Sequence, residues 1–270
     1  MERPHITSKS TKIRMILIFV ASLPFVDIAI KASGLEVRFG DKVAVTGVNL
    51  NIPKASLLSI IGPNGAGKSA LLSALAGTVE LSAGTLTIEG NNPALVLQAT
   101  EVEQSLPITV RDVVSLARYP HRGFFRRLNQ EDRDAVNRSL GRLHIEHLAN
   151  RQFRELSGGE RQRTLIAQGL AQESETLLLD EPINGLDLVS RSVIIEVIQQ
   201  ELTDGRTVVL TTHSLDDARR SDQVLLLCTE PCCFGKPEDV LTEKHLLDAF
   251  GGQHLRVGQN LILDDPQHVH

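Results

Sequence analysis

The sequence lacks several features that mark particular classes of protein. Only three cysteines occur among 270 residues, too few for a disulfide framework, and this favours a reducing compartment. Basic residues are not in surplus: 28 lysines and arginines stand against 33 acidic residues, so the net charge of −5 gives no support to nucleic-acid binding. No apolar run reaches the roughly 20 residues that span a bilayer, so we do not expect a membrane channel.

What is present is the composition of a folded domain. Apolar residues make up 41% of the chain and charged residues 23%, a balance that argues against wholesale disorder. A length of 270 residues supports a sizeable buried core. At about 150 residues per domain, the same length predicts nearly two compact units.

The hydrophobic pattern predicts an α/β fold. Short alternating or apolar stretches between Gly, Asn and Pro predict an N-terminal layer of strands over Ile28–Ala32, Val43–Leu50 and Thr85–Ile88. Almost continuous apolar runs, typical of parallel strands buried on both faces, are found at Leu57–Ile61, Thr176–Asp180 and Thr207–Thr211. A further strand is predicted at Ala94–Leu97. Apolar spacings of three and four residues predict a helical insertion at about 99–156, with helices over Val110–Ala117 and Glu131–Leu143.

A glycine-rich loop joins the strand Leu57–Ile61 to a helical stretch that starts near Lys68. The loop, Gly62-Pro-Asn-Gly-Ala-Gly-Lys-Ser69, fits the pattern G-x-x-x-x-G-K-[ST] of a phosphate-binding loop. Its glycines let backbone N–H groups curl around a phosphate, and the helix N-terminus adds partial positive charge. The Lys68 ammonium can reach the β- and γ-phosphates, and the Ser69 hydroxyl can ligate Mg²⁺. The motif predicts a nucleoside triphosphatase; the alternative is an ordinary Gly-rich turn.

Two acidic residues close another predicted strand. Asp180 ends the Thr176–Asp180 run, where its carboxylate can hold the Mg²⁺ shell. Glu181 follows directly, where it can orient or polarise an attacking water. The alternative is an acidic pair that marks the exit of a strand into a turn, because Pro182 comes next.

The segment Leu156-Ser-Gly-Gly-Glu-Arg-Gln-Arg163 has the form of a helix start. Ser157 and Glu160 have the spacing of a capping box. The box does not explain Gly158 and Gly159, which weaken the first helical turn but leave its amide hydrogens open to close approach of an anion.

Together these motifs resemble the ATP-binding subunits of ABC transporters. The resemblance covers about residues 28–250, and each motif occurs once, in the order of that family: the phosphate loop, Gln98, the signature segment Leu156–Gln162, Leu177–Glu181, Asn184–Asp187 and His213. It implies a P-loop NTPase of ABC type, with an N-terminal antiparallel β layer and the helical insertion. The domain would span residues 27–250, between an N-terminal extension of uncertain role (1–26) and a C-terminal tail (251–270).

The resemblance also implies partners and ligands. Two such subunits bind head to tail and trap two ATP molecules, so that Ser157, Gly158 and Gly159 complete the γ-phosphate site of the partner. The expected cofactors are ATP and Mg²⁺. The residues implied in nucleotide binding within one chain are Gly62, Pro63, Asn64, Gly65, Ala66, Gly67, Lys68, Ser69 and Ala70, and those implied as metal ligands are Ser69, Gln98 and Asp180.

Further residues take roles by the same resemblance. Glu181 would activate the water, His213 would touch the γ-phosphate, and Gln98 would connect the metal and the water to the membrane subunits. Asp187 would help to hold the dimer. Phe39, 29 residues before Lys68, would stack on adenine.

Four of these residues can also be interpreted as having a purely structural role. Gln98 can be an exposed polar residue after a strand, and His213 a structural residue at a strand end. Asp187 can be a helix N-cap, and Phe39 a core residue of the strand-rich layer.

The sequence departs from the family at two positions. Ala70 replaces a common Thr, and Ile183 stands where Thr or Ser is usual. Neither departure removes a charge or a metal ligand, so we expect hydrolysis to survive.

The segment after Gln98 and the end of the chain favour the metal-uptake branch of the family. Ser105–Val114, Arg118–Arg127 and Leu247–Gly252 are similar to zinc and manganese importers, although Tyr119–Arg122 also resembles siderophore and cobalamin importers. This implies a peripheral subunit at the cytoplasmic face of the membrane, with permease subunits as partners, a solute-binding protein as an indirect partner, and no nucleic acid. The rival classes are a non-transport ABC ATPase and a catalytically silent ATP-sensing module.

The basic residues Arg118, Arg122, Arg126 and Arg127 have two interpretations. They are expected either to dock on the membrane subunit or to form a solvated basic face.

Other residues fall outside the motifs. Cys228, Cys232 and Cys233 lack the spaced pairs of a structural zinc site and are expected to be incidental thiols. His254, His268 and His270 lie in what we expect to be a solvated tail.

The first 26 residues leave several interpretations open. Basic residues precede an apolar stretch from Met15 to Val26, as in a signal peptide. Export would separate the phosphate loop from ATP, so an extra strand, a membrane-surface tail or a start at Met15 is favoured.

Overall fold

The computed structural model describes residues 27–99, 107–119, 127–228 and 230–250, and the backbone of two short strands at 254–257 and 260–263. The predicted extension (1–26) lies outside these ranges, as do Arg122, Arg126, His268 and His270.

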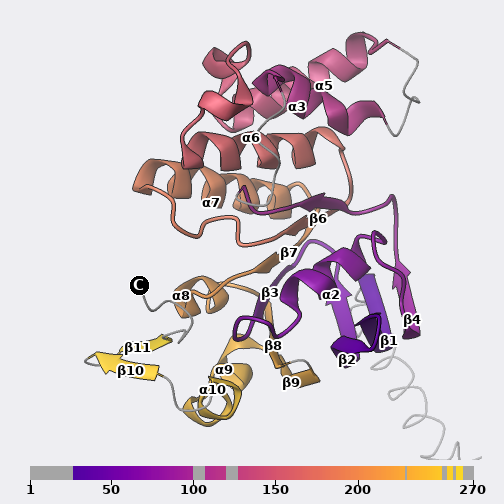
Figure 1. The fold of residues 1–270 in the computed structure, drawn as a ribbon, viewed down its shortest axis with the longest axis vertical. Coiled ribbons are helices and arrows are strands. Elements are labelled where there is room, and N and C mark those ends of the chain that lie inside the picture. The colour runs from indigo at the N-terminus through magenta and orange to yellow at the C-terminus, as the bar shows by residue number, and fades with distance from the viewer. Residues whose placement is uncertain are drawn as a thin grey trace, which may run out of the picture.

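The centre of the fold is a six-stranded sheet in the order β5-β6-β7-β3-β8-β9 (Figure 1). Neighbouring strands are parallel except β8 and β9, which form an antiparallel pair. Every residue of β3, β6 and β7 is buried, as predicted for strands covered on both faces. The strands are β3 (Leu57–Ile61), β5 (Ala94–Val96), β6 (Thr176–Leu179), β7 (Thr207–Thr211), β8 (Gln223–Cys228) and β9 (Glu230–Gly235).

A second, antiparallel sheet confirms the predicted N-terminal β layer. Its strands β1 (Ile28–Phe39), β2 (Lys42–Pro53) and β4 (Ala83–Ile88) lie in the order β2-β1-β4. Strand β1 extends seven residues beyond the predicted Ile28–Ala32, and the turn that follows it joins Phe39 to Lys42.

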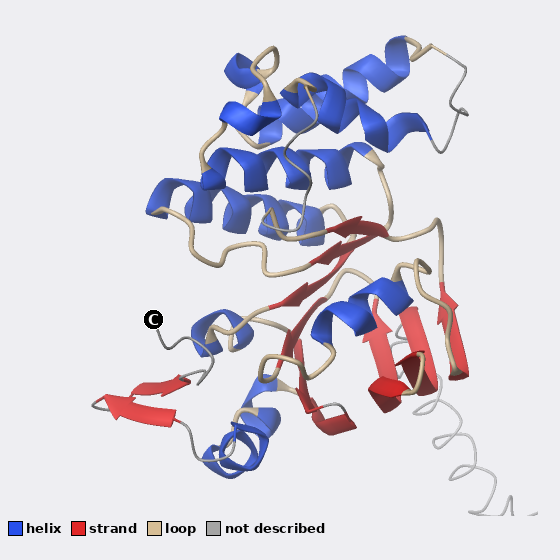
Figure 2. Cartoon of the chain, viewed as in Figure 1, coloured by secondary structure: helices blue, strands red, loops and turns tan. Residues whose placement is uncertain are grey.

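Helices cover both faces of the main sheet (Figure 2). On one face, α2 (Lys68–Leu75) and the β1–β2–β4 sheet form one apolar cluster, which includes Leu58 and Ile60 of β3. On the other face, α6 (Gly158–Ala171) and α7 (Leu188–Thr203) form a second cluster, which includes Leu57 of β3. The helix after the phosphate loop and the helix after the signature segment therefore lie on opposite faces of the sheet.

A helical layer packs on α6 and confirms the helical insertion within its described residues. Its elements are α3 (Val110–Ser115), η1 (Leu116–Arg118), α5 (Gln130–Arg142), η2 (Glu146–Leu148) and η3 (Phe153–Glu155). Capping boxes built on Thr109 and Asn129 start α3 and α5. At the far end of α5, Arg142 forms an ion pair with buried Glu201 of α7, which also binds Arg206.

The structure corrects the prediction that Arg118 belongs to an exposed or docking basic face. The Arg118 side chain is only 8% exposed, and its Nε donates to Asp132 at 3.1 Å. Its Nη1 donates to the Ala171 carbonyl and to Glu173, each at 2.8 Å. Because the Arg118 side chain joins η1, α5 and the end of α6 through these hydrogen bonds, its role is structural. Arg127, in contrast, is exposed.

The C-terminal elements pack on strand β8. Helices α8 (Leu215–Ala218), α9 (Pro237–Val240) and α10 (Glu243–Phe250) contribute to a third apolar cluster, and the predicted tail contains the hairpin of β10 (His254–Val257) and β11 (Asn260–Leu263). Cys228 and Cys233 are partly buried, and no cluster of three metal-ligating side chains occurs in the described ranges. Within those ranges, no helix combines the length and apolarity of a membrane span.

Candidate active site

The phosphate loop is held tightly against strand β2. Gly67, the last residue before α2, has φ +93°, a conformation that favours glycine. A Cβ at this position would lie 2.3 Å from the Ala44 carbonyl oxygen and 2.4 Å from Val45 Cγ2. Gly65 also has a positive φ, +79°, but no atom would crowd its Cβ. The two glycines therefore serve different needs: Gly67 a close approach of backbones, and Gly65 a left-handed turn.

The Lys68 side chain is buried in this loop. Its ammonium donates to the Gly62 carbonyl at 2.8 Å and to the Pro63 carbonyl at 3.2 Å. A cation held in a loop that leads into a helix N-terminus is suited to bind phosphate oxygens. Ser69, the next residue, is exposed.

Asp180 lies just beyond strand β6 and is fixed by Thr211 of the neighbouring strand β7. The Thr211 hydroxyl donates to Asp180 Oδ1 at 2.6 Å and accepts the backbone N–H of Glu181 at 2.8 Å. Both Asp180 and Thr211 are buried. One side chain on β7 therefore positions both acidic residues.

Glu181 is the point at which several elements meet. Its Oε1 lies 2.7 Å from Nε2 of His213, which follows β7, and its Oε2 accepts from Asn184 Nδ2 at 2.9 Å. Gln98 Nε2, beyond β5, makes a longer contact with Oε2 at 3.5 Å. The backbone of Glu181 has φ +44°, a strained value for a residue other than glycine.

The pKa of Glu181 is held below its ordinary value. The hydrogen bond from His213 is the largest cause; burial opposes it, and Asn184 and the charge of Lys68 add to the lowering. Because the ionised carboxylate only accepts hydrogen bonds, Nε2 of His213 carries the proton in this contact. The structure thus presents an ionised carboxylate, largely buried, close to the lysine of the phosphate loop.

The signature segment starts α6 as predicted. Ser157 Oγ accepts from Glu160 N at 3.3 Å, and Glu160 Oε2 accepts from Ser157 N at 2.8 Å. The two glycines differ, which refines the expectation that both leave bare amides. A Cβ on Gly159 would lie 2.3 Å from Ser190 Oγ, whereas Gly158 is exposed and has open space around it. Contact with α7 therefore explains Gly159, and nothing within the described chain explains Gly158.

Asp187 is the N-cap of α7, as its structural interpretation predicts. Its Oδ1 accepts from Ser190 N at 2.9 Å, and its Oδ2 accepts from Ser190 Oγ at 2.8 Å. These bonds lower the pKa of Asp187, the backbone N–H of Ser190 being the largest cause. The helix that follows starts with Leu188 and Val189, which are 85% and 67% exposed.

Phe39 is not a core residue. Its side chain is 54% exposed, at the end of β1 next to the turn into β2, the strand that touches Gly67. Ile183, by contrast, is buried in the cluster of α6 and α7. Ala70 packs partly buried beside α2's own cluster.

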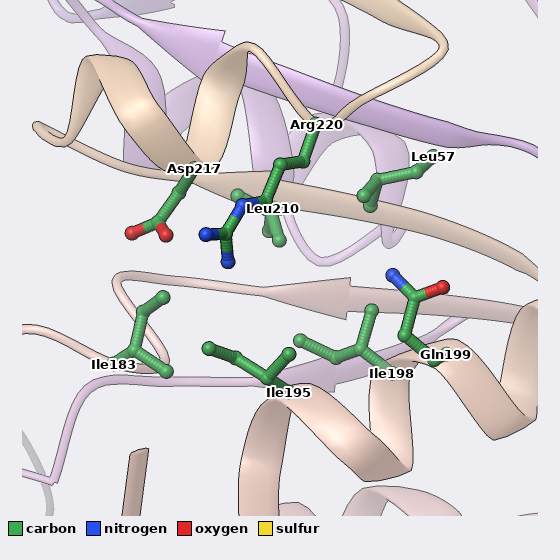
Figure 3. A pocket seen from close by; sticks show the side chains of 8 residues that line it. All are labelled: Leu57, Ile183, Ile195, Ile198, Gln199, Leu210, Asp217 and Arg220. Carbon is green, nitrogen blue, oxygen red and sulfur yellow. The ribbon is translucent and has the colours of Figure 1, made fainter. Parts of the chain in front are cut away.

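A small cavity lies between α7, α8 and the sheet. In Figure 3, Asp217 and Arg220 face Ile183 and Ile195 across it. Its volume is about 40 Å³, room for at most a few water molecules. Arg191 of α7 binds Asp217 at 2.8 Å, so an ion pair crosses between the two helices here. A nucleotide does not fit this cavity.

Sequence reasoning missed the residues that hold the acidic pair. Thr211 was predicted only as part of a strand, and Asn184 only as part of a motif. A threonine at the end of a predicted buried strand, two residues before His213, is a signal for Thr211, because a buried hydroxyl needs a partner. No comparable signal exists for Asn184.

Fold and site together define the class of protein. A parallel sheet carries a phosphate loop at the end of β3 and an acidic pair just after β6, the strand that β7 separates from β3; this is the arrangement of a P-loop nucleoside triphosphatase.

Comparisons with known proteins define the family. The family model described as ABC transporter matches residues 45–184. A probable metal transport system ATP-binding protein of Chlamydia trachomatis is 33% identical over 83% of this chain and 90% of its own. The manganese transport system ATP-binding protein MntB of Listeria innocua is 35% identical, covering 81% and 94%. A probable siderophore transport system ATP-binding protein, YusV of Bacillus subtilis, is 35% identical, covering 79% and 82%.

Solved structures agree. A metal-chelate type ABC transporter in an inward-facing conformation matches with a TM-score of 0.76 and 28% identity, covering 87% of this chain and 96% of its own. A dimeric ATP-binding cassette in a post-hydrolysis state, bound to ADP and Pi, matches with a TM-score of 0.67 and 26% identity, covering 77% and 98%. The chain belongs to the ABC transporter family, and it is an ATPase of the ATP-binding subunit type.

Proposed function

We propose that this chain drives the import of a metal ion, manganese or zinc, as the ATP-hydrolysing subunit of a transporter. Two copies would bind head to tail and trap two ATP molecules between them. The cargo class is supported by the relatives named for metal and manganese transport. A siderophore or metal-chelate cargo is the second candidate, favoured by the likeness to YusV and to the metal-chelate transporter.

The observation that carries the proposed chemistry is the convergence on Glu181. His213 and Asn184 hold its carboxylate in the ionised form, and Gln98 approaches the same oxygen as Asn184. An ionised carboxylate fixed close to a phosphate loop can orient and polarise a water for attack on the γ-phosphate. His213 would then touch the γ-phosphate while it holds Glu181.

The need for a second copy is supported by the two faces of the sheet. The phosphate loop leads into α2 on one face, and the signature segment leads into α6 on the other. Exposed Gly158, which has no crowding atom around it, offers backbone N–H groups at a helix N-terminus to an anion. In a head-to-tail pair, Ser157, Gly158 and Gly159 would meet the γ-phosphate held by the partner. Asp187 and the exposed start of α7 would lie at the same interface.

The residues of one chain fit Mg²⁺–ATP. The implied donors are oxygens, namely the Ser69 hydroxyl, the Asp180 carboxylate and the Gln98 amide, and oxygen is the ligand type that Mg²⁺ prefers. When bound, the ion would neutralise charge on the β- and γ-phosphates. Lys68 and the backbone of residues 62–70 would hold the phosphates, and exposed Phe39 would stack on adenine.

The proposed partners are two permease subunits and, through them, a solute-binding protein on the far side of the membrane. The chain would be peripheral, at the cytoplasmic face. We propose no nucleic-acid partner.

The experiment uses the complex of this chain with its permease. Glu181→Gln is expected to bind ATP and form the closed dimer but to lose steady-state hydrolysis by a factor of at least about 100, while Lys68→Ala is expected to bind ATP poorly. Nucleotide binding and phosphate release are measured separately. Hydrolysis by Glu181→Gln at the wild-type rate contradicts the role of Glu181.

The cargo is tested in proteoliposomes that contain the complex. Uptake of radioactive manganese, zinc and a ferric siderophore is compared in the presence of ATP, with Glu181→Gln as the control. ATP-dependent uptake of a free divalent ion supports the first candidate, and uptake of the chelate alone supports the second. Accumulation of label in the vesicles that does not depend on ATP would contradict both candidates.

A further inference from the structure

The segment that carries Gln98 is fixed on both sides. Before it, the carbonyl of Val96 in β5 accepts the backbone N–H of Asp180 at 2.9 Å. After it, the backbone N–H of Ala99 donates to Oε1 of Gln162 at 3.0 Å. Gln162 belongs to α6, the helix that begins with the signature segment. Gln98 therefore lies between one anchor on the main sheet and one anchor on α6.

Strand β5 also packs directly on α6. Gly169 of α6 lies so close to the strand that a Cβ there would come within 2.5 Å of Val96 Cγ2. The Gln98 segment thus starts under α6 and ends bonded to it. A displacement of α6 relative to the main sheet would move Ala99 while Val96 stays paired to Asp180, and Gln98 between them would have to shift.

Packing alone does not explain a glutamine at position 162. Its side chain is 3% exposed, and its Nε2 has no hydrogen-bond partner within the described ranges, although Oε1 has one. A buried donor without a partner is destabilising, and an apolar side chain of the same length avoids that loss. The stability of α6 therefore does not account for a glutamine here, whereas the bond to Ala99 requires one.

We propose that Gln162 is a positioning residue that holds Gln98 toward Glu181. It acts through Ala99, so that Gln98 Nε2 stays within 3.5 Å of Glu181 Oε2. This rests on the proposed function, because that function places Glu181 at the attacking water and the start of α6 at the partner's nucleotide. Gln162 then connects the two: binding of the partner's nucleotide at the N-terminus of α6 is transmitted to the hydrolytic carboxylate of the same chain.

The variants separate the hydrogen bond from the packing. Gln162→Met keeps the length of the side chain and removes the acceptor, whereas Gln162→Glu keeps an oxygen in the place of Oε1. The matched control is Thr164→Val, because Thr164 is equally buried on α6 but its hydroxyl donates to Glu160 O, at 2.8 Å, within the helix. ATPase rates of the transporter complex and the free energy of unfolding are measured for each.

In the complex, Gln162→Met is expected to lower kcat about five- to tenfold with KM for ATP changed less than about twofold, the range for a residue that acts through a neighbour. Gln162→Glu is expected to recover at least half of the loss, and Thr164→Val to stay within about twofold of wild type. Equal losses of kcat in all three variants, following equal losses of stability, would show a merely structural role and overturn the proposal.

A double-mutant cycle tests the route through Gln98. On a Gln98→Ala background, Gln162→Met is expected to change kcat by less than about twofold, because the residue it positions is gone. Effects that multiply independently would overturn the proposal. This outcome is distinct from failure of the proposed function, which would show as wild-type hydrolysis by Glu181→Gln.

Discussion

Replacing Thr211 by Val tests whether one buried hydroxyl holds both acidic residues of the site. The substitution keeps the shape of the side chain, which is fully buried, and removes two hydrogen bonds. One of them reaches the buried carboxylate of Asp180, and such a bond contributes about 1.5–3 kcal/mol. The other satisfies the backbone N–H of Glu181, whose loss adds about 1 kcal/mol. We therefore expect the free energy of unfolding to fall by about 2–4 kcal/mol.

The assay is urea denaturation followed by circular dichroism, because the chain has no tryptophan and a single tyrosine. The control is Thr176→Val in the adjacent strand β6, where the buried hydroxyl has no partner within the described ranges. That variant is expected to be neutral or stabilising, since no bond is lost. ATP hydrolysis should fall only in Thr211→Val, where the strained backbone of Glu181 is released. Equal changes of stability in the two variants would refute the reasoning.

Three further predictions concern the signature glycines, the buried arginine and the pH dependence of folding. Gly158→Ala is expected to keep stability or raise it by up to about 1 kcal/mol through helix propensity, yet to lower ATP hydrolysis in the dimer. Gly159→Ala is expected to lower stability, because its Cβ would collide with α7. Thermal melts of both variants separate the two effects, and equal melting temperatures would contradict this prediction. Arg118→Met is expected to lower the free energy of unfolding, measured by urea denaturation, by about 3–5 kcal/mol, because it leaves the charge of the buried Asp132 carboxylate less compensated. The control is Arg127→Met, which should change the free energy of unfolding little because Arg127 is exposed. A loss below about 1 kcal/mol for Arg118→Met would contradict the structural role of Arg118. The folded-state pKa of Glu181 lies below its ordinary value of about 4.3, so its ionised form stabilises the fold above that pH, and this stabilisation is lost as the pH falls through the folded-state pKa. On acidification from about pH 5 to about pH 3, Glu181→Gln should therefore lose less stability than wild type. Parallel losses of stability in the two proteins would contradict the lowered pKa.

Much of the fold follows from local patterns that the sequence displays directly. The almost continuous apolar runs of β3, β6 and β7 predict strands buried on both faces, and the Ser157 capping box fixes the start of α6. These features were predictable because each depends on residues within a few positions of one another. The phosphate loop is of the same kind.

The contacts that complete the site are of another kind, because they join residues far apart in the chain. Thr211 meets Asp180 only because β7 pairs in parallel with β6, and Gln162 meets Ala99 only because α6 packs on β5. Arg118 was assigned to a basic surface from its charged neighbours, yet partners from two other helices bury it. Charge in a sequence indicates a surface only until a buried partner is found.

The most direct test of the account asks where the signature segment of one copy lies when ATP is trapped by another. A variant with its native cysteines replaced by serine, and with Asn64→Cys and Ser157→Cys on an Glu181→Gln background, is treated with a short bifunctional thiol reagent. Asn64 is chosen because it is exposed beside Gly65, whose positive φ disfavours substitution. The account predicts a covalent dimer that forms with Mg²⁺–ATP and not without nucleotide. Stably bound ATP with no link between residues 64 and 157 of different copies would contradict it.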